Sequence, residues 1–129
     1  MKRLSTMMLA TIMTLGAMAQ TTANDVLSVA RKANDYFMAK YADPTLPTNV
    51  KKVRPSNLWT RAVYYEGLMA LQQIDPQQRY IDYAMTWADF HKWSPRNGMN
   101  TCDADDQCCG QTYIELLPYS NKDKEEQIR

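Results

Sequence analysis

The sequence holds few of the residues that metal and phosphate sites need. It has one histidine, His91, three cysteines and four glycines in 129 residues. Structural zinc sites take two closely spaced pairs of cysteine or histidine ligands, which this set does not offer. A calcium loop that began at Asp103 would place its turn glycine at Cys108 and its bidentate acid at Ile114, and neither residue can serve. Since a glycine-rich phosphate loop is also missing, we expect no metal and no cofactor.

An excess of charge of either sign is missing as well. Lysine and arginine total 15, aspartate and glutamate total 14, and the formal net charge is +1. Without a basic stripe there is no electrostatic case for binding nucleic acid. An anionic ligand would therefore need donors concentrated at one place rather than the field of the whole chain.

Long apolar runs are scarce, and the longest, MMLATIMTLGAMA, follows a basic start at the N-terminus. Such a run, with the small residues Ala17 and Ala19 at its end, is typical of a secretory signal peptide over residues 1–19. The run is too short to span a bilayer comfortably, and no cysteine follows that would carry a lipid anchor. We expect cleavage after Ala19, export to the periplasm without membrane association, and a mature domain over residues 20–129. The alternative is a buried N-terminal helix.

The three cysteines cannot all pair within one chain. Cys108 and Cys109 are adjacent, and a disulfide between neighbours is strained. A bond from Cys102 to either of them stays open, because export permits disulfides.

The remaining sequence follows the helical period. The stretch between residues 45 and 55 contains prolines and predicts a loop, and Asp43-Pro44 ends the helix before it. The expected cap of the first helix is Asn24 or Asp25, and that of the second is Ser56 or Asn57. The third helix is expected to be capped by Asp75, with Pro76 at its first position. We predict an all-α fold with helices near residues 25–42, 57–74, 76–93 and 105–117.

The four helices alternate in character. The first and third are amphipathic, whereas the second and fourth are more uniformly apolar. This alternation favours stacked αα-hairpins with an inner and an outer layer. Since NKDKEEQIR reads as the beginning of a fifth helix, we expect residues 20–129 to be the N-terminal part of a longer, truncated domain.

In such layers the two inner helices run parallel, and their N-termini meet at one mouth. We expect Trp59, Arg61 and the acids Asp103, Asp105 and Asp106 on that rim. An aromatic surface beside carboxylates and a guanidinium is the composition of a sugar site. The alternative is that the acids only cap the fourth helix and complement its dipole. The single histidine, near the C-terminal end of the third helix, is expected to be favoured there as a cation.

Three segments carry a resemblance to a known family. WTRAVYYEGLMAL, RYIDYAMTWADFHKW and ADDQCCGQTYIEL together resemble the front of the unsaturated uronyl hydrolases of glycoside hydrolase family 105, to which family 88 is related. The resemblance covers most of residues 24–120, and its most specific element is Ala-Asp-Asp, three residues, then Gly-Gln. It implies the N-terminal part of an (α/α)6 barrel.

The resemblance also implies a reaction. These enzymes remove the 4,5-unsaturated uronic acid that lyases leave on oligosaccharides from pectin, such as rhamnogalacturonan, or from a related polyuronide. An aspartic acid protonates the double bond, water adds at C5, and the hemiketal collapses. Asp105 matches the first active-site aspartate, and Trp59 matches an aromatic contact to the unsaturated ring. We expect Arg61, Asp106 and Gln111 to contact the substrate as well.

The proton-donating aspartate of the family lies further along the chain than Arg129, so we expect these residues to be inactive alone. Whether the substrate derives from rhamnogalacturonan, glucuronan or a glycosaminoglycan stays open. The alternative function is an exported helical-repeat module that binds carbohydrate or serves as a scaffold without catalysis.

Overall fold

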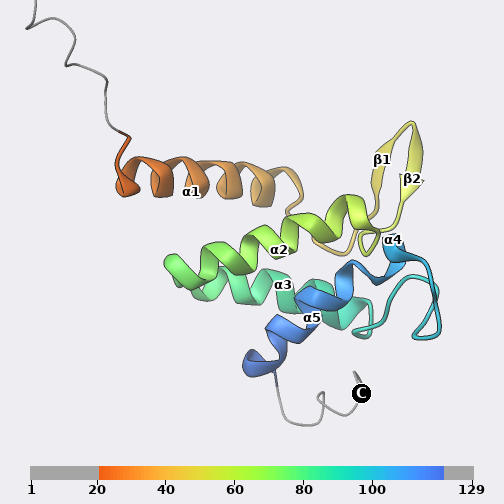
Figure 1. Cartoon of the computed structure of the whole chain (residues 1–129). Coiled ribbons are helices and arrows are strands. Elements are labelled where there is room, and N and C mark those ends of the chain that lie inside the picture. The colour runs from red at the N-terminus through yellow and green to blue at the C-terminus, as the bar shows by residue number, and fades with distance from the viewer. Residues whose placement is uncertain (1–20, 121–129) are drawn as a thin grey trace, which may run out of the picture. The chain divides into compact units, whose positions relative to one another are not determined.

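The computed structural model describes residues 21–120 and is mainly helical, which confirms the all-α class. By chain contacts the protein divides into two compact units, residues 1–32 and 33–129. The elements shown in Figure 1 are α1 (Ala23–Lys40), β1 (Thr48–Val50), β2 (Lys52–Arg54), α2 (Trp59–Ile74), α3 (Gln78–Phe90), α4 (Ala104–Gln107), α5 (Cys109–Leu116) and the short 3-10 helix η1 (Leu117–Tyr119). The expected signal peptide and fifth helix lie outside the described residues.

Within the first unit, the start of α1 is stabilised by a reciprocal cap. The side chain of Asp25 accepts hydrogen bonds from the backbone N–H and the hydroxyl of Thr22, and the hydroxyl of Thr22 accepts the backbone N–H of Asp25. The prediction of Asn24 or Asp25 as the cap was wrong, because Thr22 takes that position and Asp25 is its partner three residues on. The backbone hydrogen bond from Thr22 lowers the pKa of Asp25.

In the second unit, α2, α3 and α5 pack around an aromatic core. Tyr65 of α2 stacks on Trp87 of α3 with ring centres 3.9 Å apart, and Tyr113 of α5 lies 5.0 Å from the same indole. All three side chains are buried. In Figure 1, α2 and α3 run in opposite directions, whereas α2 and α5 both begin near the hairpin end and run the same way. The predicted parallel inner helices are therefore confirmed.

The segment predicted as a loop between residues 45 and 55 contains a β-hairpin instead. Strands β1 and β2 are antiparallel, Thr48 lies opposite Arg54, and Lys51 forms the tip with φ of 61°. The base of the hairpin is held by Ser56. Its hydroxyl lies 3.2 Å from the carbonyl oxygen of Thr45 and 2.6 Å from Nε2 of His91, and its own carbonyl accepts the Trp87 indole N–H.

The expected caps of α2 and α3 were also wrong. The N-cap of α2 is Leu58, because the polar groups of Ser56 and Asn57 are engaged elsewhere, the Asn57 amide with the carbonyl of Ser94. Helix α3 begins after Gln77, two residues later than expected. Asp75 is the C-cap of α2, and its carboxylate accepts hydrogen bonds from the side chains of Gln77 and Tyr80.

The predicted fourth helix is confirmed as α4 followed by α5, with an irregularity at Cys108. Asp103 is its N-cap, and Oδ1 of Asp103 accepts the backbone N–H of Asp105 at 2.9 Å. Among residues 21–120, no helix combines the length and the apolar character needed to cross a bilayer.

Candidate functional site

One pocket brings together two of the residues that the sequence predicted for the site. Trp59 at the start of α2 and Asp105 in α4 line the same pocket, whose volume is about 370 Å³. The indole of Trp59 is 44% exposed, and Asp105 is also exposed. The N-termini of α2 and α4 therefore lie at one mouth, as the layered arrangement predicted.

Three cations that the sequence reasoning missed line this pocket too. Lys52 and Arg54 come from β2, and Arg96 comes from the connection between α3 and α4. The signal for the first two was the charge run in KKVRP, which we assigned to a loop without a role. Positive groups beside an exposed carboxylate and an aromatic surface suit a sugar that carries an acid group.

The three acids of the opening of α4 have three different environments. Asp103 caps the helix, and Asp105 is exposed at the pocket. Asp106 is completely buried: Oδ1 pairs with Nε of Arg96 at 2.6 Å, and Oδ2 accepts hydrogen bonds from the side chains of Asn97 at 2.6 Å and Thr101 at 3.1 Å. Successive residues on a helix point about 100° apart, so Asp105 can face solvent while its neighbour Asp106 faces the interior.

These bonds give Asp106 a supporting part. Its carboxylate fixes the connection between α3 and α4 and holds Arg96 beside the pocket. A direct contact of Asp106 with substrate stays a prediction, and in this structure its side chain presents no surface to a ligand.

Arg61 does not share the rim with Asp105, so this part of the predicted arrangement was wrong. Residues two apart on a helix point to nearly opposite sides, and Arg61 therefore points away from Trp59. Its side chain is buried, one guanidinium nitrogen donates to the hydroxyl of Thr48 at 2.6 Å, and the guanidinium lies 3.9 Å from the ring centre of Tyr41. Arg61 lines a different pocket, with Tyr41.

Gln111 lies on α5 with an exposed side chain and is not among the residues that line the pocket of Asp105. Its contact with substrate stays a prediction.

The cysteines are not paired with one another. The thiol of Cys108 contacts the carboxylate of Glu66 at 3.5 Å, and its pKa is raised to about 11, chiefly by burial and then by this neighbour. Cys109 is buried, its thiol donates to the backbone carbonyl of Asp106, and burial raises its pKa as well. Both thiols are therefore protonated at neutral pH, which is unlike a reactive redox pair.

His91 is neutral, contrary to the expected cation at the end of the third helix. Burial lowers its pKa to about 4, and its ring packs against Trp87 and the hydroxyl of Ser56. Desolvation therefore outweighs the helix dipole at this position. Within the described part of the chain, no group of three or more acidic, histidine or cysteine side chains is arranged to hold a metal ion.

Comparison with protein families identifies the family of the chain. The model of Glycosyl Hydrolase Family 88 matches residues 29–129, which is most of the chain. The curated proteins and the solved structures gave no match. A glycoside hydrolase family implies a carbohydrate substrate, for which the aromatic and charged pocket around Asp105 is suited. The chain belongs to glycosyl hydrolase family 88.

Proposed function

We propose that this member of family 88 is an unsaturated uronyl hydrolase whose specificity is like that of the related family 105. Its reaction removes 4,5-unsaturated uronic acid from the non-reducing end of oligosaccharides that lyases release from pectin, including rhamnogalacturonan. The observation that carries the proposal is the pocket in which Trp59 and Asp105 lie with Arg54 and Arg96. An indole stacks on a sugar ring, a guanidinium binds the uronate carboxylate, and an exposed carboxylate takes hydroxyl groups and the attacking water.

Each side chain then has a separate role. Trp59 positions the unsaturated ring, and Asp105 holds the reacting centre while water adds at C5. Arg96 binds the carboxylate of the substrate from a position fixed by buried Asp106. The aspartic acid that protonates the double bond belongs to a later helix of the (α/α)6 domain. Residues 20–129 supply the first hairpins of that domain, following a signal peptide over residues 1–19 that directs export to the periplasm.

Binding by the chain itself is the first test. Unsaturated digalacturonate, titrated calorimetrically into the protein, should bind about tenfold more weakly when Trp59 is replaced by alanine, because the stacking surface is lost. Equal affinity of the parent and Trp59→Ala proteins would remove the sugar platform from the proposal.

Turnover is the second test, in a chain extended through the remaining helices of the domain. Asp105→Asn should slow the loss of the ultraviolet absorbance of the double bond by about 100-fold or more, because the charge that stabilises the reacting centre is removed. The matched control is Asp103→Asn, since asparagine caps a helix as well as aspartate does and the same charge is removed two residues away. If Asp105→Asn and Asp103→Asn both turned over substrate at the parent rate, Asp105 would be only a helix-dipole residue, as a binding module without catalysis would have.

A further inference from the structure

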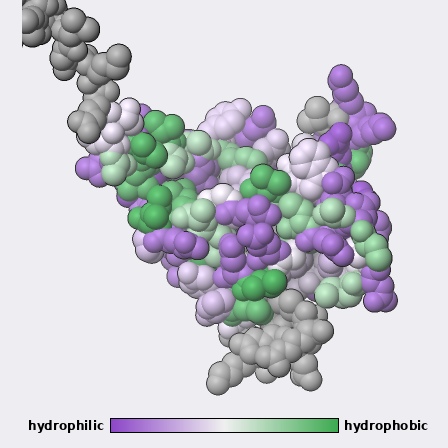
Figure 2. Space-filling model, viewed as in Figure 1, coloured by the Kyte–Doolittle hydropathy of each residue, from purple (hydrophilic) through white to green (hydrophobic). Residues whose placement is uncertain are grey.

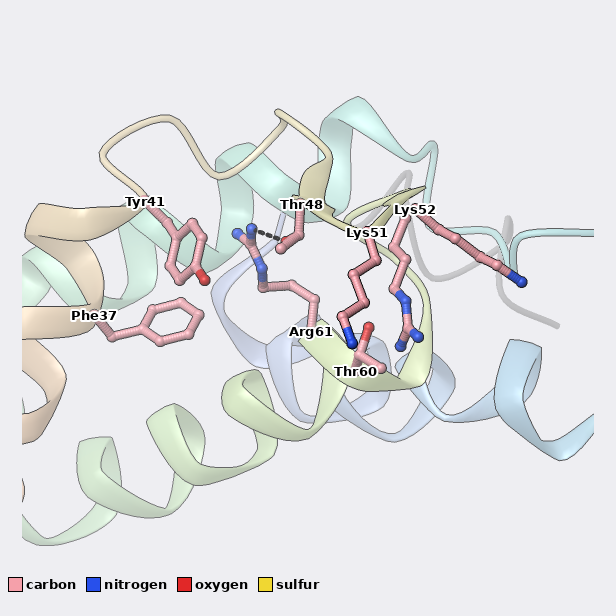
Figure 3. Close-up of a pocket in the computed structure, with 8 residues that line it drawn as sticks. Phe37, Tyr41, Thr48, Lys51, Lys52, Thr60 and Arg61 are labelled. Atoms are coloured by element: carbon pink, nitrogen blue, oxygen red, sulfur yellow. Dashed lines mark hydrogen bonds between the residues drawn. The ribbon is translucent and has the colours of Figure 1, made fainter.

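A second pocket, of about 480 Å³, shares Lys52 and Arg54 with the pocket of Asp105. Its remaining walls come from the end of α1, from the hairpin tip and from the first turn of α2 (Figure 3). The aromatic side of the pocket is formed by Phe37 and Tyr41. This pocket is therefore assembled from three segments of the second unit and is larger than the first.

The charge of this pocket has one sign. Four of its eight lining residues are cations, and none of the described residues that line it is acidic. The hairpin end that carries three of the cations shows mostly hydrophilic surface in Figure 2. In Figure 3 the side chain of Lys51 lies beside Thr60, whereas the side chain of Lys52 points away from Thr60. A nearly neutral chain thus concentrates positive charge at one place, which is what an anionic ligand needs.

Arg61 distinguishes this pocket from a group of surface lysines, because its charged side chain is buried and fixed in position. The residue is only 3% exposed, its guanidinium is held by the Thr48 hydroxyl, and it lies over Tyr41 and 5.5 Å from the centre of Phe37. Buried charges in proteins are usually paired with an opposite charge. Among residues 21–120, no carboxylate forms an ion pair with Arg61, so its positive charge is available to an anion that enters the pocket.

We propose that this pocket binds a second carboxylate-bearing sugar unit, and that it makes the protein prefer oligosaccharides with more than one acid group. The ligand follows from the walls: a ring of Tyr41 or Phe37 offers an apolar face, and the cations take the acid group. Because β2 contributes to both pockets, one oligosaccharide that carries its unsaturated unit at Asp105 places another of its uronates here. In that respect the inference rests on the proposed function.

The test uses saturated trigalacturonate, which has no double bond to hydrate, and the full chain. Lys51 is the residue to change, because it lines this pocket and not the pocket of Asp105. Lys92 is the matched control: both lysines are exposed and both have positive φ, 61° and 54°. Lys51→Gln and Lys51→Glu are compared with Lys92→Gln and Lys92→Glu in calorimetric titrations, after circular dichroism has shown that all four are helical.

The expected result is a graded loss of affinity for trigalacturonate, about threefold for Lys51→Gln and about tenfold for Lys51→Glu, with no change in the Lys92 variants. The methyl ester of trigalacturonate, which keeps the sugar and loses the charge, should bind the parent protein at least as weakly as the acid binds Lys51→Glu. Equal binding of acid and methyl ester, or equal binding by the parent and Lys51→Glu, would overturn the proposal.

Inorganic sulfate separates an acidic-sugar site from a site for any anion. Sulfate should displace trigalacturonate only at concentrations far above that of the sugar, and displacement at equal concentration would overturn the sugar assignment. Turnover plays no part in these titrations. Binding that depends on Lys51 in a protein that does not hydrate unsaturated uronides would contradict only the proposed function, and the reverse result would contradict only this inference.

Discussion

The two pockets share the cations of β2 and differ in what faces those cations. Each pocket adds further positive charge and an aromatic side chain, but only the pocket of Trp59 also has an exposed acid, Asp105. The first can therefore both bind an acid group and take part in moving a water molecule, whereas the second can only bind. In the two proposals, β2 therefore contributes to a reaction site and to a selection site, which differ by the carboxylate of Asp105.

The pockets also differ in the contacts behind them. Arg96 is held by buried Asp106, which depends on the connection between α3 and α4. Arg61 is held by Thr48 of β1 and by Tyr41. A change behind one pocket should therefore leave the other intact, and a change under their shared strand should affect both.

The largest effect is expected from Asp106→Ala, which removes the support of the first pocket. This buried carboxylate interacts with the side chains of Arg96, Asn97 and Thr101, and its loss should lower the free energy of unfolding by about 3 kcal/mol. The value is at the low end for breaking a buried ion pair, because Arg96 can turn to solvent. Urea denaturation measures the change. Asp105→Ala, one residue away but exposed, should alter stability by less than about 0.5 kcal/mol. Similar losses in the two variants would show that the burial of Asp106 does not matter.

A smaller loss of stability is expected when the pH is lowered, and it should affect the fold that supports both pockets. The pKa of His91 is lowered to about 4, so the unfolded chain, with its ordinary pKa of 6.5, binds the proton first. The stability contributed by neutral His91 is complete above pH 6.5 and is lost as the pH falls from 6.5 toward 4. The side chain is only half-buried, so the loss should be smaller than that of Asp106→Ala.

The measurement for His91 is the melting temperature between pH 7 and pH 4.5. His91→Gln should flatten the decline with falling pH, since glutamine does not titrate. An equally steep decline in that variant would assign the pH dependence to other groups.

The smallest of these effects is expected from Asp103→Ala, and it should be confined to the first pocket. Loss of the cap of α4 should cost about 1 kcal/mol, because the backbone N–H of Asp105 loses its acceptor. Trigalacturonate binding that depends on Lys51 should be unchanged, since α4 does not line that pocket. Weaker trigalacturonate binding in Asp103→Ala would mean that the pockets are coupled.

The helices could be predicted because their apolar period is long and strong, as Tyr65, Trp87 and Tyr113 show by meeting in one core. The caps could not, because several polar residues compete at each helix start. Ser56 was a reasonable cap by type, yet its hydroxyl is taken by Thr45 and His91, which are far away in the sequence. The hairpin escaped notice because its strands have three residues each and its turn has no Asn-Gly.

For the site, the sequence predicted that Trp59 and Asp105 would meet, since both stand at the starts of inner helices. It placed Arg61 on the same rim, and this was wrong, because composition says which residues are near a helix start but not which way each side chain points. The same limit applies to Asp106, whose burial depends on Arg96 and Asn97 reaching back from the preceding connection. The local sequence pattern therefore determines the helices, whereas the lining of the pocket depends on contacts between residues of different segments.

Ser56 has a consequence for how the molecule opens. Ser56, which follows β2, joins the segment before β1 to the end of α3 by hydrogen bonds. Breaking those hydrogen bonds would release the hairpin and the last turn of α3 in one event, so the two form a single cooperative unit of local unfolding. Their backbone amides should exchange with deuterium at similar rates, and a ligand in either pocket should slow the exchange of the whole unit.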